Sequence, residues 1–285
     1  MDKKEYVVSR IGLGEMWTGY LSLIASKKGN RTILKDSYSE GAFKITRPVY
    51  LTTSGEAYFY IMNPGGGYVD GDTYKINIGV EEAASAVVTT QSSTKIYKTR
   101  NRPAFQETNI YLKNGSVLEY LPDPVIAYQN ARFKQTMVVK MEVDASFLCS
   151  DIFTPGWAPD GTLFQYDFLQ SKMEIYMGDR LVLFDHVKLQ PDKDIDGIGM
   201  MEGYTHFGSL IVIDHRINSA AVEELQERFD EYLDARIGIS MLGVPGFAVR
   251  VLANSTQGIE KVQSICHETI RRNILKTDPV FLRKY

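Results

Sequence analysis

Residues 132–143 have the sequence RFKQTMVVKMEV, and this stretch decides the fold class. One set of alternate positions is mostly apolar: Phe133, Gln135, Met137, Val139, Met141 and Val143. The positions between them are mostly charged or polar: Arg132, Lys134, Thr136, Lys140 and Glu142. A period of two predicts a long β-strand with one buried face and one face in water.

Other parts of the chain also have sequence features typical of β-strands. Ile76, Ile78 and Val80 alternate with polar or small residues, and the chain contains 17 Tyr and 13 Phe, which favour strands. Turn-forming residues at 113–115 (Lys-Asn-Gly) and 178–180 (Gly-Asp-Arg) predict two β-hairpins. The chain is therefore predicted to be mainly β.

An internal repeat indicates how the strands are arranged. Ser85, Ser116 and Ser146 each follow a polar turn and precede a short apolar run, at spacings of 31 and 30 residues. A period of this length predicts stacked β units, a superhelix or solenoid-like stack, whose strands we expect to be antiparallel. The alternative is a chance recurrence of strand and turn, as in any β protein.

The pattern changes after Gly199. We expect a strand at 206–214, a helix capped by Asn218 or Ser219, two strands at 235–242 and 247–253, and a helix opened by Ser255. The second helix carries an apolar stripe of Ile259, Val262, Cys266, Ile270 and Ile274. We divide the chain into a β-rich superhelical core, residues 1–199, and a C-terminal α+β portion, residues 200–285, packed as one domain.

Composition excludes several classes of function. A net charge of −3 and a pI of about 5.9 give no general attraction to nucleic acid. No apolar run is long enough for a membrane span. Only two cysteines, Cys149 and Cys266, are present, which favours a reducing cytoplasm over a disulfide framework.

The first candidate site is the glycine-rich segment at residues 63–72, NPGGGYVDGD. Gly65, Gly66 and Gly67 allow close approach of the backbone. Asp72 stands where a phosphate-binding loop needs Lys, which argues against a nucleotide. Two interpretations stay open: a tight bend between strands, or a polar path on which Asp70 and Asp72 bind a cation weakly.

Two further segments carry polar groups. Residues 89–97, TTQSSTKIY, contain Thr90, Gln91 and Tyr97, which line a polar path or simply bond to nearby backbone. Residues 118–128, LEYLPDPVIAY, contain Glu119 and Asp123, which either face each other as acid and base or sit at a solvated bend. No His or Cys spacing typical of a closed metal site, and no nucleophile–base motif, is present.

Taken together and in this order, these three segments resemble the urease accessory protein D family, also called H. Further similarity lies at 47–50 (RPVY), 131–133 (ARF) and 246–250 (GFAVR), so the resemblance covers nearly the whole chain. The segment at 154–157 (TPGW) departs from the commonest family pattern.

The resemblance implies an all-β superhelical fold with a few helices and no catalysis by this chain. It implies a scaffold that binds accessory partner F and, through it, the GTPase G, in an assembly that we expect to be dimeric and to dock on apo-urease. It further implies that Ni(II) passes through a polar tunnel in transit, with no tightly bound cofactor. We assign this path to Asp70, Asp72, Thr90, Gln91, Tyr97, Glu119 and Asp123, with Gly65, Gly66 and Gly67 for backbone approach.

A different class of function competes with this one. A β-solenoid carbohydrate-active enzyme would use a pair of carboxylates such as Glu119 and Asp123 across a cleft, within about 10 Å of each other.

Overall fold

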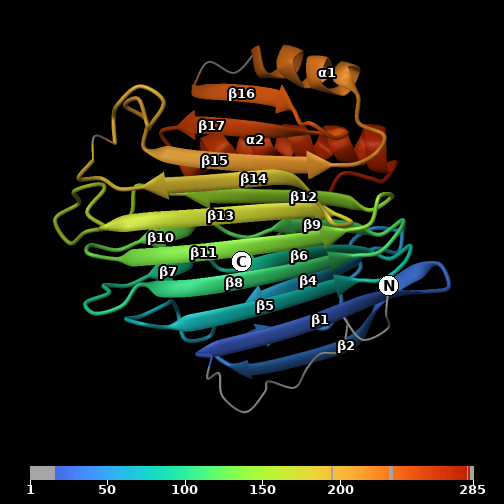
Figure 1. Ribbon diagram of the computed structural model, residues 1–285, viewed down its shortest axis with the longest axis horizontal. Helices are drawn as coiled ribbons and strands as arrows, with labels where there is room; N and C mark the ends of the chain where they lie inside the picture. The colour runs from blue at the N-terminus through green and yellow to red at the C-terminus, as the bar shows by residue number, and fades with distance from the viewer. Residues whose placement is uncertain (1–16, 194, 231–233, 281, 283–285) are drawn as a thin grey trace.

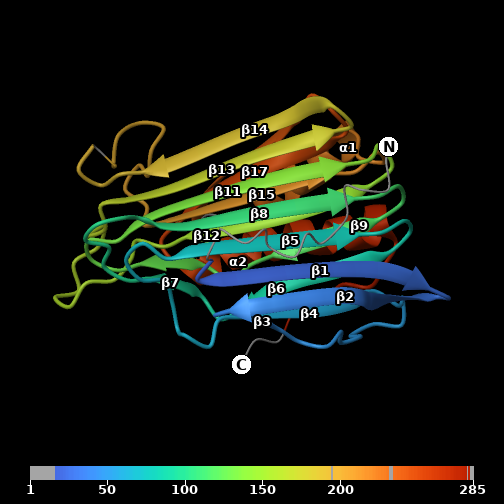
Figure 2. The same ribbon diagram turned by 60° about the horizontal axis from the view of Figure 1, so that its bottom comes forward.

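The computed structural model describes residues 17–285 except 194, 231–233, 281 and 283–285. Residues 1–16 of the expected core therefore lie outside the described part. Within that part the chain forms two stacked β-sheets, with helices against only one of them (Figures 1 and 2).

One sheet has seven strands in the described residues. In spatial order they are β14 (Arg180–Leu189), β13 (Phe168–Met177), β11 (Arg132–Met141), β8 (Ala104–Leu112), β5 (Thr73–Val80), β1 (Gly19–Lys28) and β2 (Arg31–Gly41). This sheet faces the viewer in Figure 1, and no helix covers it there.

The other sheet has ten described strands. Its main path is β16 (Ala235–Met241), β17 (Gly246–Ala253), β15 (His206–Ile213), β12 (Ser146–Phe153), β9 (Val117–Leu121), β6 (Ser85–Gln91), β4 (Ala57–Met62) and β3 (Lys44–Ile45). Two short strands, β7 (Thr94–Ile96) and β10 (Val125–Ala127), pair beside this path.

The chain alternates between the sheets from β5 to β13, so each coil lies on the previous one. Neighbouring strands of successive coils run parallel, as in β5–β8–β11–β13 and β4–β6–β9–β12. The expectation of antiparallel strands was therefore wrong for the centre of both sheets. Successive coils run in the same direction, and parallel neighbours need a long connection, which the opposite sheet supplies here. Antiparallel pairs occur toward the ends, such as β1–β2, β13–β14 and β15–β17.

The predicted repeat corresponds to these coils, with one register error. Ser85 pairs with Val117, and Val117 pairs with Ser146, so Ser116 lies one residue before the equivalent position. The turn at residues 178–179 does join a hairpin, β13 to β14. The turn at 113–115 does not, because it carries the chain from β8 in one sheet to β9 in the other.

The expected strand in the stretch 132–143 is β11, which ends at Met141. Its inward residues Phe133, Met137 and Val139 are buried, whereas Lys134 and Lys140 are exposed. Val143 lies beyond the strand and is 63% exposed, so it does not belong to the buried face as expected.

The C-terminal elements follow the predicted order. They are β15, α1 (Ser219–Asp230), the hairpin of β16 and β17, α2 (Thr256–Thr269), and a π-helical segment over Ile270–Leu275 that continues α2. The Asn218 side chain accepts the amide of Ala221, and the Ser255 side chain accepts that of Gly258, so both helices have the expected caps.

Two hydrophobic clusters hold the layers together. One lies between the sheets, with Ile76, Ile110 and Val139 from one sheet and Phe59 and Leu118 from the other. The second lies between the ten-stranded sheet and the helices. It contains the whole predicted stripe of α2 and the π-helical segment: Ile259, Val262, Cys266, Ile270 and Ile274. Because β15 pairs with β12 and contributes to both clusters, residues 206–213 are part of the sheet stack.

Candidate functional site

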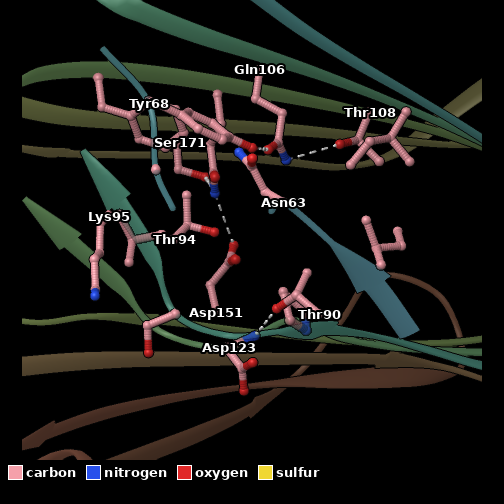
Figure 3. A pocket seen from close by; sticks show the side chains of 18 of the residues that line it. Asn63, Tyr68, Thr90, Thr94, Lys95, Gln106, Thr108, Asp123, Asp151 and Ser171 are labelled. Atoms are coloured by element: carbon pink, nitrogen blue, oxygen red, sulfur yellow. Dashed lines mark hydrogen bonds between the residues drawn. The ribbon is translucent and has the colours of Figure 1, made fainter. Parts of the chain in front are cut away.

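A polar cavity of about 70 Å³ lies between the two sheets. This volume has room for a few water molecules. Carboxylate, amide and hydroxyl groups line it, together with apolar core residues. Figure 3 shows the Asp151 carboxylate near the centre of this space, between Ser171 and Asp123.

The glycine-rich segment forms part of the cavity wall. Gly66 and Gly67 line the cavity, whereas Gly65 does not. Gly67 has a φ of +153°, and a Cβ there would lie 2.6 Å from the Lys95 carbonyl oxygen. Only glycine fits at this position, because the β7 backbone passes directly against it. Gly65 is exposed, and its amide donates to the Asn63 side chain at 3.0 Å.

Asp70 and Asp72 hold the ends of this segment and do not line the cavity. Asp70 accepts the backbone amides of Asn101 and Arg102, both at 2.9 Å. These amides, first that of Arg102, lower the pKa of Asp70. Asp72 accepts the Val69 amide at 2.8 Å and the Tyr74 hydroxyl at 3.1 Å. Asp72 therefore caps a local turn, whereas Asp70 ties this segment to the backbone of residues 101–102.

The segment at residues 89–97 lines the cavity with only part of its length. Thr90 and Gln91 line the cavity, and the Thr90 hydroxyl accepts the backbone amide of Asp123 at 2.7 Å. Tyr97 does not line it; its ring lies 4.8 Å from that of Tyr128, centroid to centroid. Two of the three predicted residues of this segment thus lie at the cavity.

Asp123 lies where the cavity meets a second hollow. A groove of about 710 Å³ lies between α2 and the ten-stranded sheet. The cavity and the groove share Ser92, Ser93, Pro122 and Asp123. In Figure 3 the Asp123 side chain points away from Asp151. The bend between β9 and β10 therefore forms the wall between the two spaces.

Several cavity residues were not predicted as site residues. Gln135 donates to Ser171 Oγ at 3.0 Å and to Asp151 Oδ2 at 3.4 Å. Burial raises the pKa of Asp151 to about 7, although the hydrogen bond from Gln135 opposes this effect. A signal was present for Gln135, since it interrupts the apolar face of residues 132–143.

A second hydrogen-bonded group lies across the cavity from Asp151. The Tyr68 hydroxyl donates to Gln106 Oε1 at 2.5 Å, and Gln106 donates to the Thr108 hydroxyl at 3.3 Å (Figure 3). The Tyr68 ring stacks on that of Tyr74, with centroids 3.7 Å apart. These contacts hold the amide and hydroxyl groups of the wall in fixed orientations.

Glu119 lies outside the cavity, contrary to its predicted place on the path. Its neighbours Leu118 and Tyr120 face the other sheet, whereas its carboxylate contacts His267 and Arg271 on the helix side. Arg271 is buried and also donates to Glu56 and Tyr58.

The charges of this buried cluster stabilise one another. Burial disfavours the charge of Glu119, but His267 and Arg271 outweigh it, so the pKa of Glu119 is lowered. Since Arg271 engages its carboxylate, Glu119 is not placed to act with Asp123 as a catalytic pair. The arrangement does not favour the carbohydrate-active alternative.

The described residues contain no group of three or more His, Cys, Asp or Glu side chains that could hold a metal ion. Among the same residues, no helix is both long and apolar enough to cross a membrane. The side chains at the cavity that could bind a metal ion are carboxylates, amides and hydroxyls, and Lys95 adds an amino group to the wall.

Comparison with known proteins identifies the family. The family model described as UreD urease accessory protein matches residues 18–284. The chain is 47% identical to the urease accessory protein UreD of Lachnoclostridium phytofermentans over 271 residues, which cover 94% of this chain and 99% of the relative. It is also 47% identical to the UreD of Bacillus sp. TB-90 over 269 residues (94% and 99%) and 38% identical to that of Bacillus cereus over 269 residues (94% and 98%). The chain belongs to the UreD family of urease accessory proteins.

Proposed function

We propose that this chain is a non-catalytic scaffold that helps to deliver Ni(II) to apo-urease in the cytoplasm. Family membership supports a role in urease maturation. In this proposal the chain acts with the accessory proteins F and G, where G is the GTPase, and the complex assembles as a dimer. The chain contributes a route for the ion and a surface for its partners.

The observation that carries the proposal is the polar cavity between the sheets and its shared wall with the outer groove. Asp151 offers a carboxylate inside the cavity, and Asp123 lies at the wall. Oxygen ligands bind Ni(II) less tightly than imidazole or thiolate, so an ion held by them can move on. The ion would pass from the groove to the cavity beside residues 92–93 and 122–123.

The proposed path is narrower than the one expected from the sequence. It keeps Gly66, Gly67, Thr90, Gln91 and Asp123, which line the cavity, and it adds Asp151. Gly65, Asp70, Asp72 and Tyr97 support the wall from outside. Glu119 supports the helix layer through its contacts with His267 and Arg271.

The test is the nickel content of urease matured in cells that contain all accessory proteins. We expect Asp151→Asn and Asp123→Asn to lower nickel loading while complex formation is kept and the melting temperature does not fall below that of the wild type. Asp72→Asn is the matched control, because the same change is made at a turn outside the cavity. Full loading with both cavity variants, or an equal loss with the control, would overturn the proposed route.

A further inference from the structure

The outer face of the seven-stranded sheet carries a basic patch beside an open strand edge. The helices cover the ten-stranded sheet only, and β14 pairs with β13 alone among the described strands (Figure 1). We define the basic patch as Lys134, Lys172, Lys188, Phe168, Phe184 and His186.

Sheet register places these side chains together. Lys134 pairs with Gln170, which pairs with Lys188, so the two lysines flank one residue of β13. Lys172 and His186 form the next pair on the same face, two residues along. With strands about 4.8 Å apart and about 6.8 Å between alternate residues, the three lysines originate within about 10 Å of one another.

Two phenylalanine rings hold the ammonium groups in place. The Nζ atoms of Lys134 and Lys188 lie 5.9 and 5.8 Å from the centroid of Phe168, and that of Lys172 lies 5.5 Å from Phe184. Such contacts orient a cation without neutralising it.

Carboxylates do not cancel this charge. Among the described residues, none of the three lysines has a carboxylate oxygen within 4.0 Å. On the same face Glu107 pairs with Lys75 instead, and Glu174 accepts the Tyr176 hydroxyl. The patch is thus a local positive site on a chain of net charge −3.

We propose that the basic patch and the edge of β14 dock an extended acidic segment of a protein partner. A strand added to β14 would hydrogen-bond to its free backbone groups and would place alternate side chains opposite Phe184, His186 and Lys188. Acids opposite His186 and Lys188, and an apolar side chain opposite Phe184, complement this edge in charge and polarity. Phe184 is 55% exposed, so a docked segment would bury apolar surface of its ring that is now in water.

The strand geometry leaves this edge usable. Edge strands are normally protected by bulges and charges. The bulge of β14 lies at Val182, so the run from Leu183 to Leu189 is regular. The patch is also too small for a nucleic acid, which is bound along a longer track of cations. It lies on the face opposite the groove and does not depend on the proposed nickel route.

The test uses fluorescence anisotropy with a labelled short peptide of alternating glutamate and valine. We expect saturable, salt-sensitive binding to the wild-type protein. Lys134→Glu combined with Lys172→Glu and Lys188→Glu should weaken binding about tenfold or more. The matched control reverses the exposed Lys27, Lys28 and Lys44 on other strands, an equal change of net charge, and should alter binding less than about twofold.

Amide hydrogen exchange provides the second readout. Peptide binding should slow exchange within Leu183–Leu189 if the segment pairs with the edge of β14. Absence of binding, equal loss in both triple variants, or unchanged exchange in β14 would overturn the proposal. Equally tight binding of a single-stranded oligonucleotide or of anionic vesicles at the same patch would also overturn it, since the site would then select charge alone.

Discussion

The guanidinium of Arg271 donates to the carboxylate of Glu119 across 2.5 Å, and the two side chains join the helix layer to the centre of the ten-stranded sheet. Arg271 is 0% exposed and Glu119 is 1% exposed. The ion pair therefore lies where an unpaired charge is costly.

Arg271→Met is expected to lower the free energy of unfolding by about 3–5 kcal/mol. The substitution leaves the carboxylates of Glu56 and Glu119 buried without their shared cation. Urea denaturation followed by circular dichroism measures this loss. Lys35→Met breaks the exposed ion pair with Glu81 and should cost less than about 1 kcal/mol; equal losses in the two variants would contradict the prediction.

Asp151→Asn is expected to stabilise the protein at alkaline pH. The folded chain retains the Asp151 proton up to about pH 7, whereas the unfolded chain releases it near pH 4. Ionisation therefore costs the folded state stability as the pH rises between these values. The asparagine is neutral throughout, so the variant should exceed the wild type by up to about 4 kcal/mol at pH 8 and match it near pH 4.

Asp70→Asn provides the control of opposite sign for that pH series. Its pKa is lowered, so its carboxylate favours the folded state above the pKa of the unfolded chain, and this contribution disappears as the pH falls. The Asp70 variant should lose stability at pH 8. Identical pH profiles for the two variants would show that neither carboxylate has the assigned environment.

Gly67→Ala is expected to destabilise the fold by about 2–3 kcal/mol. A methyl group at this φ of +153° would meet the Lys95 carbonyl at 2.6 Å and the Tyr97 ring at 2.7 Å. Gly66→Ala is the matched neighbour, with a φ of +80° and no atom within 4 Å, and should cost about 1 kcal/mol. Thermal unfolding of the two variants tests the difference, and a reversed order would be inconsistent with the close approach of β7.

Gly208→Ala is expected to push α2 away from β15 and to cost about 1–3 kcal/mol. A Cβ at Gly208 would lie 2.3 Å from Ile259 Cγ2. Gly238→Ala on β16 meets nothing within 4 Å and should be nearly neutral. Ile259→Ala removes the Cγ2 atom, so the double variant should lose less stability than the two single losses added together; a double-mutant cycle without coupling would argue against this contact.

Periodicity predicted the elements well and their directions poorly. The alternation around Phe133 and the caps Asn218 and Ser255 identified strands and helices, because these signals are local. A period of two is the same in a parallel and an antiparallel strand, so the direction of β11 relative to β8 could not be read. The Lys-Asn-Gly turn at 113–115 likewise bends the chain without specifying which sheet receives it.

The candidate site was only partly predictable for a related reason. Thr90, Gln91 and Asp123 were identified from their own segments, whereas Asp151 becomes a cavity residue only when β12 is placed opposite β11 and β13. Glu119 looked like a solvated acid at a bend because its partner Arg271 lies 152 residues later in the chain. Pairs so far apart in the chain can be identified only when the three-dimensional fold is known.

The position of Arg271 also sets an order of events during protein synthesis. Glu56 and Glu119 are made 215 and 152 residues before Arg271. At a translation rate of about 5–20 residues per second, Glu56 exists for roughly 10–40 s before the cation that will neutralise it. During that interval the outer face of the sheet must stay hydrated, because two carboxylates without a counter-ion resist burial. The two carboxylates gain their cation only when Arg271 has been made, so the helix layer closes over this face of the sheet after the rest of the chain has been translated.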